Sequence, residues 1–157
     1  MKTNDITLYH GSRKALPIGT ILISQSGGYT AGDDAFLDPD EAKSIALTEK
    51  ILESRRPAAA PNRMTAVYLS ESSDPDQIEK SGGYANYVYE VVPVNKPHRC
   101  NLYWYSEIYA LTFDKLTHKD RADAEEYARN YWNATPGQRD NYEYLTDQAK
   151  IVRKVSN

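Results

Sequence analysis

Residues 87–93 (YVYEVVP) constrain the fold of this chain more than any other segment. They are rich in β-branched and aromatic residues and end at a proline, which cannot donate a backbone hydrogen bond within a sheet. We therefore expect a strand here, placed at the centre of a sheet.

Four weaker segments have the composition of strands, and two have the spacing of helices. Strands are expected at residues 6–10, 20–24, 64–69 and 149–155, with Glu143 on a short strand or turn before the last of them. Helices are expected at residues 39–54, where Asp38 is the N-cap, and at residues 119–132, with a short helix between residues 73 and 82.

The order of these elements predicts an α+β fold, because the strands and helices lack the regular alternation of a doubly wound parallel fold. The glycine pairs at residues 27–28 and 82–83 do not form a Gly-x-Gly-x-x-Gly turn, so a Rossmann-type nucleotide site is not indicated. A chain of 157 residues fits one domain, which we expect to span residues 1–157.

The composition narrows the classes of function. Cys100 is the only cysteine, and the three histidines lack the spacing of metal ligands, so a mechanism without a metal is expected. The net charge of -3 argues against an extended basic surface for duplex nucleic acid. No segment is apolar enough to span a membrane and no secretory signal pattern is seen, so we expect a cytosolic protein.

Three short motifs follow one another at the edges of apolar runs. They are residues 8–13 (LYHGSR), which contain His10, then Tyr68 in the segment AVYLS, and Glu143 in the segment YEYL. Taken alone, they can be explained as a strand that ends at a glycine turn, an ordinary strand tyrosine, and an exposed glutamate at a strand edge. Taken in this order, they resemble the His-Tyr-Glu signature of ADP-ribosyltransferases of the diphtheria-toxin and poly(ADP-ribose) polymerase type.

The resemblance implies how the first motif would bind NAD. Gly11 would hold the nicotinamide carboxamide through its backbone, because only a residue without a side chain lets the backbone approach so closely. His10 would bond the ribose on the adenine side, and Ser12 and Arg13 would line the same groove. Tyr68 would stack on the cationic nicotinamide ring, an attraction of about 0.5 to 2 kcal/mol.

The resemblance also implies a second stacking tyrosine and a catalytic carboxylate. Tyr84, beside the glycine pair, is our choice for the second tyrosine, and Tyr87 is the alternative; both lie further along the chain than the family pattern suggests. Glu143 would stabilise the oxocarbenium-like ribose cation and bond the ribose 2′-hydroxyl. Position 141 is an asparagine, so the Glu-x-Glu or Gln-x-Glu pattern of arginine-modifying toxins is missing.

As a whole, the resemblance implies two small sheets that form an NAD cleft with flanking helices. The implied activity is mono-ADP-ribosyl transfer from NAD to an unknown acceptor, which is a protein, a nucleic acid or a small molecule. Short chains with this signature are often toxins or defence factors, which act in the cytosol of their own cell or of a target cell.

Several alternatives stay open at this point. An NAD glycohydrolase would use water as the acceptor, and an inactive domain of the same fold would only bind NAD. RNA 2′-phosphotransferases share the fold but would not need Glu143. Rifampicin ADP-ribosyltransferases have an aspartate shortly after the strand at residues 87–93, whereas residues 97–101 (PHRCN) contain no carboxylate here. A catalytic thiol at Cys100 beside His98 is a weaker hypothesis.

Overall fold

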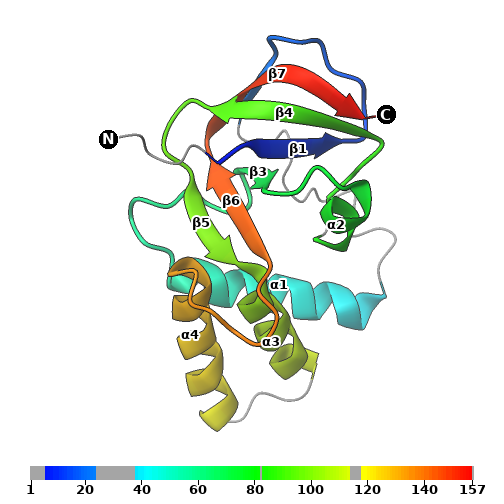
Figure 1. The fold of residues 1–157 in the computed structure, drawn as a ribbon. Helices are drawn as coiled ribbons and strands as arrows, with labels where there is room; N and C mark the ends of the chain where they lie inside the picture. Colours follow the sequence, from blue (N-terminus) through cyan, green and yellow to red (C-terminus); the bar gives the residue numbers. More distant parts are fainter. Residues whose placement is uncertain (1–5, 24–37, 82, 114–117, 157) are drawn as a thin grey trace.

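Seven strands in the described part of the chain pair into one antiparallel sheet, accompanied by four helices (Figure 1). The structure is a computed structural model and describes residues 6–23, 38–81, 83–113 and 118–156. The strands are β1 (Leu8–Ser12), β2 (Ile21–Ile23), β3 (Val67–Ser70), β4 (Tyr87–Pro93), β5 (His98–Asn101), β6 (Tyr142–Thr146) and β7 (Gln148–Ser156). The helices are α1 (Pro39–Ser54), α2 (Pro75–Lys80), α3 (Leu102–Phe113) and α4 (His118–Trp132).

The α+β class is confirmed, but the expectation of two small sheets is wrong for the described strands. Their order is β2-β7-β4-β1-β3-β6-β5, and every neighbouring pair is antiparallel. β1 lies between two groups of strands, β2, β7 and β4 on one side and β3, β6 and β5 on the other. It pairs with β4 along its whole length and with β3 at Tyr9 and Ser70. The two groups are therefore parts of one sheet.

β4 has the predicted bounds and the predicted interior place, between β1 and β7. Its residues Val88, Tyr89 and Val91 are buried. Each packs in an apolar cluster, Val88 with α2 and the other two with neighbouring strands. The hydrophobic run is explained by this burial, because each of these side chains leaves water on folding.

Four predicted strands differ in their bounds, β7 by one residue at each end. β1 continues past His10, so Gly11 and Ser12 lie within the strand and do not form a turn. β3 begins at Val67, because residues 63–65 form a turn in which the Asn62 side chain accepts a hydrogen bond from the Met64 amide. β2 covers residues 21–23 of the predicted segment; residue 24 and the glycines at 27, 28 and 82 lie outside the described residues.

The helices at 39–54 and near 75–80 are confirmed, and α4 begins one residue before the predicted start. Asp38 caps α1 as expected, since its carboxylate accepts from the Asp40 amide at 3.0 Å. α3 was not predicted. Its N-terminal signal is Asn101, whose side-chain oxygen accepts from the Tyr103 amide at 3.1 Å, a pattern obscured by the aromatic residues that follow.

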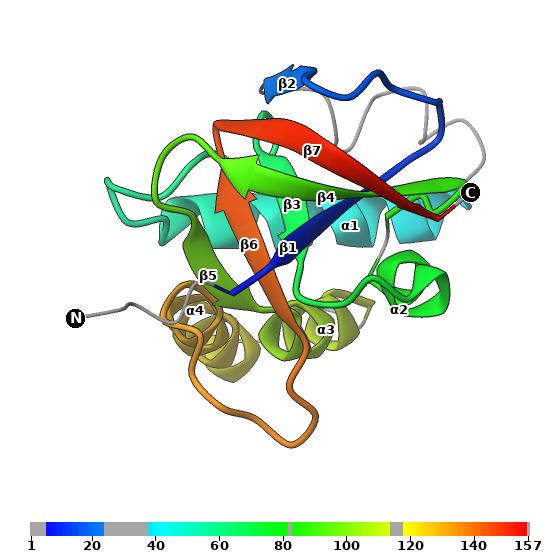
Figure 2. The ribbon, with the colours of Figure 1, turned by 45° about the horizontal axis from the view of Figure 1, so that its top comes forward.

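The helices divide the molecule unevenly. α1, α3 and α4 gather around the end of the sheet that carries β5 and β6, whereas α2 stands apart near the ends of β1 and β4 (Figures 1 and 2). The main core lies between these three helices and β5 and β6, and includes Leu52, Trp132 and Leu145. None of the described helices is long and apolar enough to cross a membrane.

Candidate functional site

Glu143 lies on β6, inside the sheet, with a neighbour on each side. It is paired in register with Ser70 of β3 and with Cys100 of β5. Only 6% of the residue is exposed. The explanation of Glu143 as an exposed strand-edge residue is therefore wrong, and its buried charge requires a partner.

The partner is Arg63, in the turn before β3. Its Nη1 atom donates to Oε1 of Glu143 at 2.8 Å, and its Nε and Nη2 atoms contact Glu49 of α1 at 2.9 and 3.1 Å. Arg63 is buried, as is Glu143, and Glu49 is largely covered. One guanidinium thus bridges two carboxylates from different parts of the chain.

Tyrosines surround this ion pair. The Tyr131 hydroxyl accepts a hydrogen bond from Arg63 and donates one to Oε1 of Glu143 at 3.1 Å. The Tyr68 hydroxyl donates to the Arg63 backbone carbonyl. The Arg63 guanidinium lies 5.1 to 5.3 Å from three tyrosine ring centres, within range of cation–π attraction. We call this set the Arg63 cluster; it comprises Glu49, Arg63, Tyr68, Tyr105, Tyr131 and Glu143.

The Arg63 cluster carries a net charge of -1 when both carboxylates are ionised, since one arginine faces two glutamates. Burial raises the pKa of Glu143, and the Arg63 charge and the Tyr131 hydrogen bond oppose that rise. Burial also raises the pKa of Tyr68 and Tyr131, so both hydroxyls stay protonated and can donate. The cluster therefore presents an excess of negative charge beside aromatic rings, an environment that favours a cation.

His10 is connected to the Arg63 cluster through Tyr68. Its Nδ1 atom lies 3.0 Å from the Tyr68 backbone carbonyl. A carbonyl can only accept, so Nδ1 carries the hydrogen, and in the neutral ring Nε2 is an acceptor. Burial lowers the pKa of His10, which is 3% exposed, so the neutral ring is favoured.

The closest neighbour of Gly11 is the Tyr84 carbonyl, whereas the nicotinamide carboxamide was expected to approach this residue. A β-carbon at this position would overlap the Tyr84 carbonyl oxygen and lie 2.7 Å from Cγ2 of Ile78 on α2. The close approach that requires a glycine here is therefore made by the chain itself. The segment at Tyr84 covers the face of Gly11 on which a side chain would stand.

Ser12 and Arg13 point to other partners. The Ser12 hydroxyl donates to the Lys14 carbonyl at 2.7 Å. The Arg13 guanidinium stacks over the Tyr84 ring at 4.0 Å.

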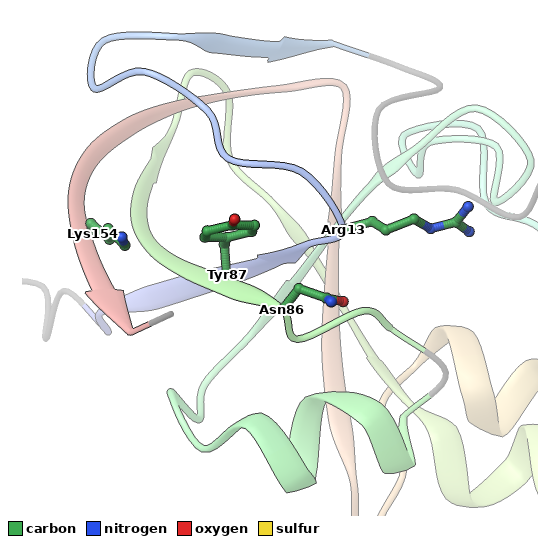
Figure 3. Close-up of a pocket in the computed structure, with 4 residues that line it drawn as sticks. All are labelled: Arg13, Asn86, Tyr87 and Lys154. Atoms are coloured by element: carbon green, nitrogen blue, oxygen red, sulfur yellow. The ribbon is translucent and has the colours of Figure 1, made fainter.

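Arg13 also lines an open hollow of about 440 Å³ with Asn86, Tyr87 and Lys154. Figure 3 shows Lys154 beside the Tyr87 ring, with the Arg13 guanidinium directed away from both. His10, Tyr68 and Glu143 do not line this hollow. Of the residues predicted to line the NAD groove, Arg13 therefore lies at the hollow, whereas His10 and Tyr68 lie at the Arg63 cluster.

The sequence prediction missed Arg63, Glu49 and Tyr131. Glu49 had a signal, because it follows Ile45 by four residues and precedes Leu52 by three, on the apolar side of α1. Arg63 had none, since a residue in a turn has no periodicity to reveal its burial. Asn101 was missed as a support for β6; its side-chain oxygen accepts from the Asn141 amide at 3.1 Å.

No protein-family model matches this chain, and no curated protein sequence is significantly similar to it. In the part of the chain that the structure describes, no group of three or more histidine, cysteine, aspartate or glutamate side chains is arranged to hold a metal ion. The assignment of a function therefore depends on the residues and their geometry.

Proposed function

We infer that this chain is a mono-ADP-ribosyltransferase, which cleaves NAD at the nicotinamide–ribose bond and transfers ADP-ribose to an acceptor. One observation carries the proposal: His10, Tyr68 and Glu143, distant in sequence, are linked by contacts. The His10 ring binds the Tyr68 carbonyl, and the Tyr68 hydroxyl binds the backbone of Arg63, whose side chain holds Glu143. The residues of the His-Tyr-Glu signature, on β1, β3 and β6, are thus connected through the backbone carbonyls of Tyr68 and Arg63 and through the Arg63 side chain, which supports the proposal.

The chemistry of this set suits the breaking of a glycosidic bond to a cationic leaving group. Nicotinamide in NAD is a positively charged ring, and the ribose becomes an oxocarbenium-like cation as the bond breaks. A carboxylate close to that cation stabilises the transition state, and aromatic rings nearby attract the charged nicotinamide. Glu143 supplies the first group and Tyr68 the second.

His10 has a role that its tautomer defines. With Nδ1–H donated to the Tyr68 carbonyl, the acceptor at Nε2 is suited to a ribose hydroxyl, which donates. His10 would bind NAD through this acceptor and so help to place the nicotinamide ribose near Glu143. It would not act as a proton donor, because burial favours its neutral form.

The proposal is tested by incubating the purified protein with NAD and following two products. Release of nicotinamide shows cleavage, and mass spectrometry of lysate treated with labelled NAD locates ADP-ribose on protein, nucleic acid or a small molecule. Glu143→Gln should abolish most of both signals, while the matched control Glu90→Gln should keep them, since Glu90 pairs with Arg153 away from the cluster.

Each outcome has one meaning for the proposal. Label on an acceptor supports a transferase, whereas free ADP-ribose as the sole product would make the protein an NAD glycohydrolase. Tight binding of NAD without any cleavage would reduce it to a binding module. No binding and no cleavage would overturn the proposal altogether.

A further inference from the structure

The two carboxylate oxygens of Glu143 have different surroundings. Oε1 accepts hydrogen bonds from Arg63 at 2.8 Å and from Tyr131 at 3.1 Å. Among the residues that the structure describes, no donor contacts Oε2. A buried carboxylate oxygen without a donor is costly, so this atom is suited to a hydroxyl supplied by a ligand.

The groups that hold Oε1 are themselves held. Two nitrogens of the Arg63 guanidinium contact Glu49, and the Arg63 backbone carbonyl accepts from the Tyr68 hydroxyl. Tyr131 is fully buried on α4, and its ring packs edge-on against Trp132. Neither donor can follow a rotation of the Glu143 carboxylate without losing its own contacts.

We propose that Arg63 and Tyr131 are positioning residues, which hold Oε1 of Glu143 from two directions and so present Oε2 to the 2′-hydroxyl of the nicotinamide ribose. This inference rests on the proposed cleavage of NAD. It adds which carboxylate oxygen of Glu143 contacts the 2′-hydroxyl, and which residues orient that carboxylate. Arg63 and Tyr131 act through Glu143 and do not touch the reacting bond. Their removal leaves the carboxylate in place but lets its plane turn.

The test compares NAD with an analogue that lacks the 2′-hydroxyl on the nicotinamide ribose. The ratio of kcat/KM for the two substrates measures how well Oε2 is placed, and it does not depend on how much of the enzyme is folded. Tyr131→Phe keeps the ring and removes the hydroxyl. We expect this ratio to fall about tenfold, through kcat for NAD more than through KM, because Oε1 of Glu143 loses one of its two donors and Arg63 loses its acceptor on Tyr131.

A matched control is available one turn earlier on the same helix. Tyr127→Phe makes the same change at a half-buried tyrosine that packs against Trp104 and is not among the residues that contact Glu143. Its ratio should stay at the wild-type value. Arg63→Lys is a second variant on the Glu143 side; it keeps a positive charge but cannot span both carboxylates, and its ratio should fall as well.

The results separate this inference from the proposed function. An unchanged ratio in Tyr131→Phe and Arg63→Lys, whether NAD cleavage is intact or lowered for both substrates alike, would overturn the positioning role while the activity stands. A wild-type protein that releases no nicotinamide would overturn the proposed function, and this inference with it.

Discussion

The Arg63 cluster and the hollow at Tyr87 combine arginine or lysine with tyrosine, but in opposite ways. In the cluster, Arg63 is buried among three tyrosine rings and bound to two carboxylates. In the hollow, Lys154 lies 5.5 Å from the Tyr87 ring centre. Arg13 and Lys154, the two cations that line it, are both exposed, and none of the lining residues is acidic.

The difference shows that burial decides how strictly the position of a charged side chain is fixed. Exposed charges are solvated and screened by salt, so their positions cost little to change. Buried charges must be compensated by oriented partners, and the loss of one partner affects all the others. We therefore expect substitutions in the cluster to have large and coupled effects, and substitutions in the hollow to have small ones.

The largest effect is expected from Arg63→Met. This change leaves Glu49 and Glu143 covered without their cation, and removal of one partner from a buried ion pair typically costs about 3 to 5 kcal/mol. The same substitution at Arg13 is the matched control and should cost less than about 1 kcal/mol, since it removes an exposed cation–π contact. Chemical denaturation of the two variants measures both values; equal losses would contradict the contrast between the regions.

A smaller effect is expected from Gly11→Ala, on β1 next to His10. The added β-carbon would meet the Tyr84 carbonyl and Ile78, so the segment at Tyr84 must shift. Overpacking of this kind costs about 1 to 3 kcal/mol. Gly19→Ala is not a suitable control because Gly19 has a positive φ of 90°; Ala15→Gly, in the exposed loop after β1, serves instead. A Gly11→Ala variant as stable as wild type would show that Tyr84 does not constrain this position.

The pH dependence of NAD cleavage should report the burial of Glu143. Burial raises its pKa above the ordinary value near 4.5. The protonated form predominates below the pKa and cannot stabilise a cation, so kcat should fall as the pH drops through a midpoint above that value. The charged or titratable groups that face Glu143 are those of Arg63, Glu49, Tyr68, Cys100, Tyr105 and Tyr131.

Tyr131→Phe sharpens the pH prediction, because it removes a hydrogen bond that stabilises the ionised carboxylate. The acid limb of the profile should therefore move to higher pH in this variant. Rates of nicotinamide release between about pH 4 and about pH 8 measure the shift. An acid limb that is unmoved in Tyr131→Phe would show that the hydroxyl does not contribute to the charge state of Glu143.

Local patterns in the sequence predicted most of the elements and the place of β4, because strand composition, helix caps and spacing are properties of short segments. These local patterns did not predict the Arg63 cluster. Arg63 and Glu143 are separated by 80 residues, and only the pairing of β3 with β6 brings them together. The expectation of two sheets came from the family resemblance, and the pairing of Tyr9 with Ser70 that joins β1 to β3 is likewise a property of the folded sheet.

The central claim is that the Glu143 carboxylate acts on the transition state of NAD cleavage. Glu143→Gln keeps the shape of the side chain and removes its charge, so nicotinamide release by this variant, measured beside its NAD affinity, is the most direct test. We predict a fall in kcat of about a hundredfold or more, with NAD affinity nearly unchanged. Full activity in a folded Glu143→Gln protein would contradict the claim, and an equal loss of binding and rate would make Glu143 a residue that holds NAD or the fold.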